Sequence, residues 1–181
     1  MAGGQSFWGR WRVRVGYPVA AACLWLAAPT PRSIALGAVV AAAGLVVRGA
    51  AAGRLRKHEA LATSGPYART RNPLYFGTVF LGVGFAVASW SPWAAALLVG
   101  YFLLFYPAVM KREEGELREH YGAAFEEYAA RVPLFWPRLR RAGSAGEGFS
   151  WAIYGRNREY QALLGFLAGL VLLWLRMKMG R

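Results

Sequence analysis

The sequence predicts an all-α protein, a multi-pass transmembrane helical bundle of about five membrane helices with no Rossmann domain, folded as a single domain over residues 1–181. Composition is the first observation behind this prediction, because 56% of the residues are hydrophobic and only 17% are charged. That is too apolar for a soluble domain. The second is the aromatic content of 8 Trp, 9 Tyr and 10 Phe, which is typical of chains that anchor at lipid interfaces.

The chain carries 22 Lys and Arg against 9 acidic residues, all of them Glu, and its formal net charge is +13. In a soluble protein this excess would suggest nucleic acid as a partner. In a membrane protein it arises when basic residues gather in cytoplasmic loops, so we expect the lipid bilayer and no nucleic acid. With 1 Cys and 2 His, a disulfide framework and a Cys-rich zinc site are excluded, and no metal is expected.

Residues 15–53 are expected to form the first two membrane helices. A spanning helix needs about 20 mostly apolar residues, and this stretch is interrupted only by Arg32 and Arg48. The long side chain of Arg48 is expected to snorkel toward the interface from the helix end. The Arg-rich start also resembles a signal peptide. However, a second apolar stretch follows almost at once, which favours a membrane helix that is not cleaved off.

A helical hairpin is expected over residues 72–110, which contain no charged residue. The length suits two spans, and Pro92, between two Trp, marks the turn that joins them. Because the two helices are antiparallel, their far ends meet at one membrane face. Asn72 and Glu113 are therefore expected to be neighbours.

A cytoplasmic amphipathic helix is expected over residues 111–131. At about 100° per residue its apolar side chains form one stripe, in which Glu114 falls, with Glu113 on the border. A carboxylate that faces packed protein near the membrane is a functional candidate. The structural alternative is an ion pair of Glu114 with Arg71 or Arg112. The stripe itself consists of Leu117, Tyr121, Ala124, Phe125 and Tyr128.

Several smaller features have structural interpretations. Asn72 before Pro73 is a good helix start, in which the Asn side chain caps the helix. Pro107 is expected to bend the fourth span and open a pocket below the two Glu. Close glycine pairs are expected to pack helices in lipid, and both His are expected at the surface. These residues are Gly49 with Gly53, Gly82 with Gly84, Gly165 with Gly169, and His58 with His120.

A C-terminal membrane helix is expected over residues 150–176, after a flexible connection over residues 138–148. Its uncharged part, residues 160–175, is short for a span. Most basic residues place the N-terminus and the site on the cytoplasmic side. A crossing helix then carries Arg176 and Lys178 to the opposite side, against the charge rule. Crossing is the favoured interpretation, and a tilted or re-entrant helix is the alternative.

The order of motifs between Glu59 and Pro133 resembles the isoprenylcysteine carboxyl methyltransferase family and its phospholipid methyltransferase relatives. The spacing between the motifs is that of the family, so the signal is specific. The matching residues are Leu61-Ala-Thr-Ser-Gly-Pro-Tyr67, Arg71-Asn-Pro-Leu-Tyr-Phe-Gly77, Glu113-Glu114, Leu117, Tyr121-Gly122, Tyr128 and Arg131-Val-Pro133.

The resemblance implies an integral membrane methyltransferase that uses S-adenosylmethionine, acts on a lipophilic small-molecule or lipid-linked acceptor, and has its catalytic core in residues 59–137. In the family, the cofactor is held by the segment before the Tyr, by an Arg-His-Pro-x-Tyr box and by the first Glu of the pair. Carried over by position, these residues are Glu59, Ala60, Leu61, Ala62, Tyr67, Asn72, Pro73, Leu74, Tyr75 and Glu113.

Two departures from the family pattern concern the acceptor. Asn72 stands where the prenylcysteine enzymes have His, and Asn cannot become a cation. Val109 stands where those enzymes have an Arg that is thought to meet the substrate carboxylate. This argues against a prenylcysteine carboxylate unless Lys111 or Arg112 substitutes.

The candidate catalytic residues depend on the atom that receives the methyl group, which the resemblance leaves open. A carboxylate would need a cationic clamp, Arg71 or Arg112, whereas an amine would need a base, Glu114. Two other functions remain as alternatives. One is a non-catalytic membrane scaffold that kept the fold. The other is an NADPH-dependent sterol reductase-like enzyme, whose C-terminal part shares the Tyr-Gly and Arg-Val-Pro stretches.

Overall fold

The computed structural model describes residues 7–56, 59–139 and 148–180. All the regular secondary structure in these ranges is helical, which confirms the all-α prediction. His58 and most of the predicted 138–148 connection lie outside the described residues. The elements are α1 (Phe7–Leu26), α2 (Pro31–Ala52), the 3-10 helix η1 (Gly65–Ala68), α3 (Pro73–Ser89), α4 (Pro92–Tyr121), α5 (Ala123–Arg131), α6 (Trp151–Arg156) and α7 (Tyr160–Met179).

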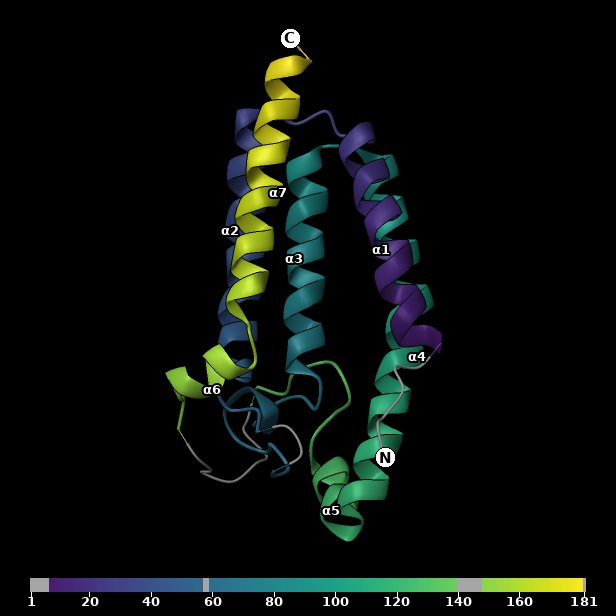
Figure 1. Cartoon of the computed structure of the whole chain (residues 1–181), viewed down its shortest axis with the longest axis vertical. Helices are drawn as coiled ribbons and strands as arrows, with labels where there is room; N and C mark the ends of the chain where they lie inside the picture. Colours follow the sequence, from purple (N-terminus) through teal and green to yellow (C-terminus); the bar gives the residue numbers. More distant parts are fainter. Residues whose placement is uncertain (1–6, 57–58, 140–147, 181) are drawn as a thin grey trace.

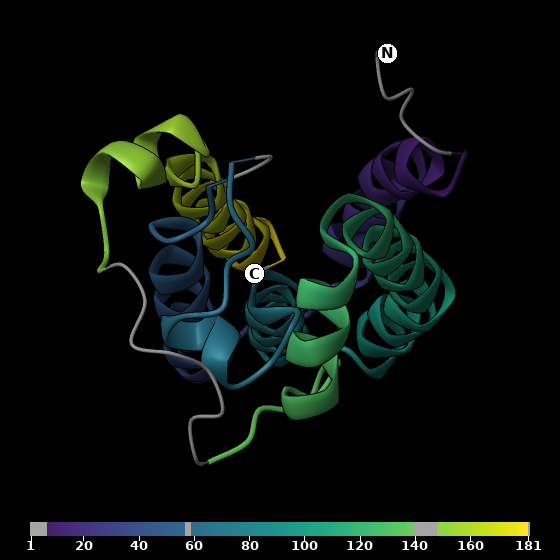
Figure 2. The same ribbon diagram turned by 90° about the horizontal axis from the view of Figure 1, so that it is seen from below.

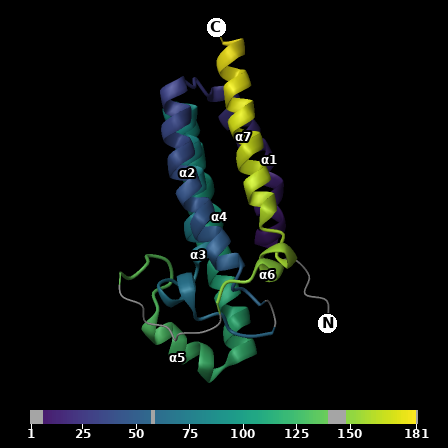
Figure 3. The ribbon, with the colours of Figure 1, turned by 90° about the vertical axis from the view of Figure 1, so that its left-hand side faces the viewer.

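The long helices α1, α2, α3, α4 and α7 run along one axis (Figure 1). α1 packs against α4, whereas α2, α3 and α7 pack against one another. The short elements η1, α5 and α6 gather at one end of the bundle, which we call the loop end and which Figure 2 shows from below. The opposite end, here the far end, holds the short connections and the C-terminus (Figure 3).

Three helices, α2, α4 and α7, are long and apolar enough to cross a membrane by length and composition. α3 is apolar but has only 17 residues, and the first part of α1 carries three arginines, Arg10, Arg12 and Arg14. The class of the fold is therefore the predicted one, while the count of five spans stays a prediction. Exposed Trp side chains occur toward both ends, as aromatic residues do at two interfaces. The most exposed of them are Trp25, Trp90 and Trp93 toward the far end and Trp136 and Trp151 toward the loop end.

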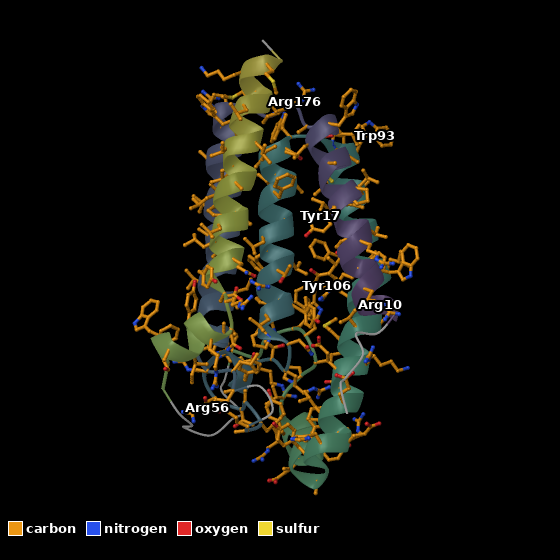
Figure 4. The ribbon with its side chains drawn as sticks, in the orientation of Figure 1. Arg10, Tyr17, Arg56, Trp93, Tyr106 and Arg176 are labelled. Atoms are coloured by element: carbon orange, nitrogen blue, oxygen red, sulfur yellow. The ribbon has the colours of Figure 1, made fainter. Side chains whose placement is uncertain are left out.

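α7 runs from the loop end to the far end beside α2 (Figure 1). Arg176 consequently lies toward the far end, as Trp93 does, whereas Arg10 and Arg56 lie toward the loop end (Figure 4). This is the direction that a crossing helix would take. The basic residues at its end are thus separated from the basic residues of the loops by the length of the bundle.

α2 and α3 approach closely because glycines face each other at two levels of the bundle. A Cβ atom added to Gly37 would lie 2.3 Å from the carbonyl oxygen of Gly84, and one added to Gly44 would lie 2.5 Å from that of Gly77. Small residues at such contacts let helix backbones pack in lipid, where the hydrophobic effect does not drive association. The predicted packing role of Gly84 is confirmed.

The other glycines predicted to pack helices differ in their contacts. Gly53 packs on the ring of Phe149, and a Cβ atom on Gly82 would lie 2.3 Å from the ring of Phe102. The prediction is wrong for Gly165, which is exposed and has no heavy atom within 4 Å of an added Cβ. The reason is that this face of α7 points away from the bundle, and a small residue signals packing only where a helix meets a neighbour.

The turn between α3 and α4 follows the sequence prediction. Trp90 ends α3 in the left-handed conformation with a φ of 50°. Ser91 then caps α4, because its side chain accepts from the backbone N–H of Ala94. Pro92 takes the first helical position, where a missing N–H has no cost.

The helix predicted over residues 111–131 is divided in the structure. α4 continues unbroken to Tyr121, after which Gly122 takes a φ of 51° that suits glycine and starts α5. Phe125 and Tyr128 of the predicted apolar stripe are buried together with Leu61 packed against them. The stripe therefore packs on the loop that precedes η1.

Candidate functional site

A cavity of about 830 Å³ lies at the loop end, within the size range of small-molecule and cofactor sites. Its wall is made by residues of α1, α2, α3, α4 and α5 together with the loop between α2 and η1. Tyr106, which lines the cavity, lies between α3 and α4 (Figure 4). A single cavity thus connects the membrane helices with the loops.

Most of the residues predicted to form the site line this cavity. Glu59 does not, because its exposed carboxylate pairs with Arg156, with Oε1 and Nη1 2.9 Å apart. Arg112 does not either, and its Nε lies 2.7 Å from Oε1 of Glu116 on the exposed side of α4. The predicted residues in the wall are Ala60, Leu61, Ala62, Tyr67, Arg71, Asn72, Pro73, Leu74, Tyr75, Glu113 and Glu114.

Tyr75 on α3 connects three helices at the cavity wall. Its hydroxyl donates to Oε1 of Glu113 on α4 at 2.6 Å and accepts from Nη1 of Arg12 on α1 at 3.2 Å. The guanidinium of Arg12 also lies over the Tyr75 ring, 5.8 Å from its centroid, which is within cation–π range. The start of α3 and Glu113 therefore meet, as the antiparallel hairpin predicts. Glu113 itself is exposed to the cavity opening.

Arg71 and Glu114 form an ion pair with Nε and Oε1 2.5 Å apart, and both side chains are only 15% exposed. Nη1 of Arg71 also donates to the carbonyl oxygens of Ala129 at 2.7 Å and Val132 at 2.9 Å. The ion pair that was the structural alternative for Glu114 is thus the observed arrangement. In it, Arg71 holds the end of α5 against the start of α3, and the predicted roles of Arg71 as a clamp and Glu114 as a base stay predictions.

Asn72 does not cap α3 with its side chain, so the predicted capping role is wrong. Its Nδ2 instead donates to the carbonyl oxygen of Leu134 at 3.1 Å, and Oγ1 of Thr70 donates to that of Phe135 at 2.9 Å. The physical reason is that the chain after α5 crosses the start of α3 and presents unpaired carbonyls to these side chains. The crossing therefore holds the segment after α5 against the start of α3.

Tyr128 connects α5 to η1, because its hydroxyl donates to the carbonyl oxygen of Tyr67 at 2.8 Å. Burial raises the pKa of Tyr67 and the pKa of Tyr128 above the usual tyrosine value. Both phenols therefore stay neutral at physiological pH, and Tyr67 offers the cavity an uncharged aromatic ring.

We expect Tyr128→Phe to lower the free energy of unfolding by about 1 kcal/mol, because the carbonyl of Tyr67 loses its donor while the ring still packs. Thermal unfolding of the detergent-solubilised protein measures the effect. Tyr160→Phe, at an exposed position of α7, is the matched control. Equal unfolding midpoints for the two variants would show that the hydroxyl contributes nothing.

Other residues of the cavity wall were not predicted as site residues, among them Arg12, Arg48, Thr78 and Tyr106. Only Arg48 gave a signal, as a charge inside an apolar stretch, and the expected snorkelling is wrong. Its Nε and Nη2 bind the carboxylate of Glu159 at 2.6 and 3.0 Å, and Nη1 donates to Oγ1 of Thr78 at 2.5 Å. A charge in a helical bundle is less costly when paired inside it, and Glu159 at the start of α7 provides the partner.

Comparison with known families identifies the segment around this cavity. Residues 35–124, about half of the chain, match the family model described as phospholipid methyltransferase. This segment belongs to the phospholipid methyltransferase family. It contains most of α2 and all of α3 and α4, and so most of the helical wall of the cavity. α1, α6, α7 and most of α5 lie outside it, as do Arg12 and Glu159.

Three curated relatives extend the comparison. An Arabidopsis thaliana protein-S-isoprenylcysteine O-methyltransferase B is 32% identical over 80 residues, which cover 44% of this chain and 41% of the relative. The nickel-cobalt-cadmium resistance protein NccN of Alcaligenes xylosoxydans xylosoxydans is 40% identical over 84 residues, 46% of this chain and 39% of the relative. The cobalt-zinc-cadmium resistance protein CzcN of Cupriavidus metallidurans is also 40% identical over 84 residues, 46% of this chain and 38% of the relative.

Each match thus spans about two fifths of the relative's length. No solved structure matches the chain. The family segment and the isoprenylcysteine relative confirm the resemblance stated from the motifs, and they support a membrane methyltransferase.

Proposed function

We propose that the protein is an integral membrane methyltransferase that transfers a methyl group from S-adenosylmethionine to a lipidic or small hydrophobic acceptor. One observation carries the proposal. Most of the residues that the resemblance assigns to the cofactor, which are far apart in sequence, line one cavity within a methyltransferase family segment, and this cavity reaches from the loops to the apolar helices. Such a cavity is suited to a polar cofactor from the aqueous side and a lipophilic acceptor from the membrane. We infer that the aqueous side is the cytoplasm.

The residues present fit S-adenosylmethionine, which has an amino acid end, a ribose and an adenine. Glu113 provides a carboxylate for its ammonium or ribose hydroxyls, since it is exposed to the cavity and held by Tyr75. The start of α3 offers backbone N–H groups that no side chain caps, which suits a carboxylate. Tyr67 provides a buried neutral ring wall for the adenine. These assignments concern binding only.

When bound, S-adenosylmethionine supplies an electrophilic methyl group on a sulfonium. The acceptor's lone pair forms the new bond to the methyl carbon, and the electron pair of the broken sulfur–carbon bond passes to sulfur. The chain therefore needs no covalent residue, and its task is to align the reactants and exclude water. Since Glu114 is already paired with Arg71, the arrangement favours an acceptor that needs no base.

Metal resistance, which the names of two bacterial relatives mention, has no counterpart among the described residues. In residues 7–56, 59–139 and 148–180 no group of three His, Cys, Asp or Glu side chains is placed to hold a metal ion. Nothing in this part of the chain therefore favours a metal-binding function over methyl transfer.

Equilibrium binding of radiolabelled S-adenosylmethionine to the detergent-purified protein tests the proposal. We expect saturable binding that Glu113→Gln and Tyr75→Phe each weaken at least tenfold, because the first removes the charge and the second the hydroxyl that orients it. Glu119→Gln, at an exposed position of the same helix, is the matched control and should bind like the wild type.

NADPH serves as the comparison ligand in the same assay. Absence of saturable S-adenosylmethionine binding by the wild type would contradict the proposal. In that case NADPH binding would favour the reductase alternative, and binding of neither ligand would favour the scaffold. Equal weakening by Glu119→Gln would show that Glu113 has no specific role.

A further inference from the structure

The hydroxyl of Tyr75 lies between two charged groups from different helices. It donates to Oε1 of Glu113 at 2.6 Å and accepts from Nη1 of Arg12 at 3.2 Å. A phenol has one proton to donate, whereas a guanidinium has only donors and a carboxylate only accepts. Arg12 therefore occupies a lone pair of the hydroxyl and leaves its proton to Glu113, which fixes the direction of both hydrogen bonds.

Arg12 also strengthens the contact between Tyr75 and Glu113. A donor to a hydroxyl oxygen polarises the O–H group, so the bond that this group makes onward becomes stronger. The guanidinium lies over the Tyr75 ring, 5.8 Å from its centroid, and the ring makes an edge contact with Tyr106 at 5.3 Å between centroids. Tyr75 is thus held from two sides, with its hydroxyl directed at the carboxylate.

The turn of α1 that carries Arg12 is itself fixed against α4, the helix that carries Glu113. The backbone carbonyl oxygen of Arg12 accepts from the hydroxyl of Tyr101 on α4 at 2.9 Å. Gly16, one turn further along α1, leaves room for this contact, because an added Cβ would lie 3.2 Å from the Tyr101 hydroxyl oxygen. The partly buried side chain of Arg12 is therefore presented to α3 from a fixed backbone.

We propose that Arg12 is a positioning residue of the cofactor site, which acts through the Tyr75 hydroxyl to orient the carboxylate of Glu113 toward S-adenosylmethionine. The proposal rests on the proposed methyltransferase function. Tyr75 and Glu113 lie within the family segment, residues 35–124, whereas Arg12 lies outside it. α1 then provides a part of the cofactor site that the family segment does not contain.

The charge of the ligand separates this role from a general electrostatic effect of Arg12. S-adenosylmethionine has a net positive charge, because its ammonium and sulfonium outnumber its carboxylate, and S-adenosylhomocysteine lacks the sulfonium charge. A cation that acted only through space would repel the first ligand more than the second, so its removal would favour S-adenosylmethionine. The ammonium and ribose that Glu113 is proposed to hold are common to both ligands. Loss of positioning therefore weakens both by the same factor.

The test measures equilibrium binding of both radiolabelled ligands to the full detergent-purified chain. Arg12→Met and Arg12→Gln each remove the cation, the first with an apolar side chain suited to a membrane helix, and Arg12→Lys keeps a cationic donor. Tyr75→Phe is tested alone and together with Arg12→Met. The matched control is Arg14→Gln, at an exposed position two residues along the same helix. Size-exclusion chromatography confirms that each variant is monodisperse.

We expect Arg12→Met and Arg12→Gln to weaken binding of both ligands about fivefold, since the hydroxyl loses the donor that directs its proton. Arg12→Lys should weaken binding less, and Arg14→Gln should bind like the wild type. In the Tyr75→Phe background, Arg12→Met should add less than about a twofold loss, because residues that act in one network are not additive.

Binding by Arg12→Met and Arg12→Gln equal to that of the wild type would overturn the proposal. Tighter binding of S-adenosylmethionine by these variants, or unequal changes for the two ligands, would overturn it as well, because Arg12 would then act by its charge alone. Additive losses in the double variant would show that Arg12 does not act through Tyr75. These three results leave the methyltransferase proposal standing, whereas no S-adenosylmethionine binding by the wild type would overturn both proposals.

Discussion

Gly44→Leu is expected to lower the free energy of unfolding by about 3 kcal/mol or more, at the upper end of the cost of overpacking. Even a Cβ atom at this position would lie 2.5 Å from the carbonyl oxygen of Gly77 and 2.9 Å from Cβ of Phe80. Backbone atoms cannot turn aside as a flexible side chain can, so α2 and α3 must separate. Thermal unfolding and the monodisperse fraction in size-exclusion chromatography, both in detergent, measure the loss.

Gly165→Leu is the matched control for this prediction. It makes the same change in an apolar helix at a glycine where an added Cβ meets no heavy atom within 4 Å, so we expect an unfolding midpoint close to that of the wild type. Similar unfolding midpoints for Gly44→Leu and the wild type would show that the two helices can move apart without a loss of stability. The close approach would then not be what holds α2 and α3 together.

Glu159→Leu is expected to destabilise the protein by about 3 kcal/mol, because breaking a buried ion pair leaves an uncompensated charge. The side chain of Glu159 is only 8% exposed and that of Arg48 20%, so water replaces the lost partner poorly. Removing both charges in Arg48→Leu/Glu159→Leu should restore most of the stability. A double-mutant cycle on thermal unfolding in detergent measures the coupling.

Glu119→Leu, which removes an exposed carboxylate from α4, provides the reference for this second prediction. We expect it to change the unfolding midpoint little, as surface substitutions usually do. Two results would refute the idea that Glu159 compensates Arg48. One is a Glu159→Leu midpoint equal to that of Glu119→Leu, and the other is a double variant no more stable than the single one.

Much of the fold was predictable because its signals are local. The uncharged stretch over residues 72–110 with Pro92 inside it predicts two antiparallel helices, and Ser91 and Pro92 start α4 as such residues do. Antiparallel helices joined by a short turn bring their free ends together, so the meeting of Asn72 and Glu113 in one cavity also followed. The break at Gly122 was not foreseen, because a glycine within an apolar period is compatible with a continuous helix.

The motif around residues 59–75 and Glu113 likewise predicted most of one cavity wall. Of the charged groups, however, only Glu114 had its partner Arg71 among the alternatives, and the partners of Glu59 and Arg112 were not predicted. Glu59 and Arg112 stand beside cavity residues in the sequence, yet neither lines the cavity; Glu59 pairs with Arg156 and Arg112 with Glu116. Arg112 is next to Glu113 in α4, and neighbours in a helix point in different directions. Position within a motif therefore does not fix what a side chain contacts.

The sequence by itself determined that the chain is helical and apolar, where its central hairpin turns, and which motif residues meet at the hairpin's open end. Hydrophobicity, proline and glycine act within a few residues, so these features are readable along the chain. Only the tertiary structure decided that Arg48 pairs with Glu159, 111 positions away, and that Arg12 reaches Tyr75, 63 positions away. The partner of a charge depends on which helices pack side by side, because ion pairs form between surfaces that folding brings together.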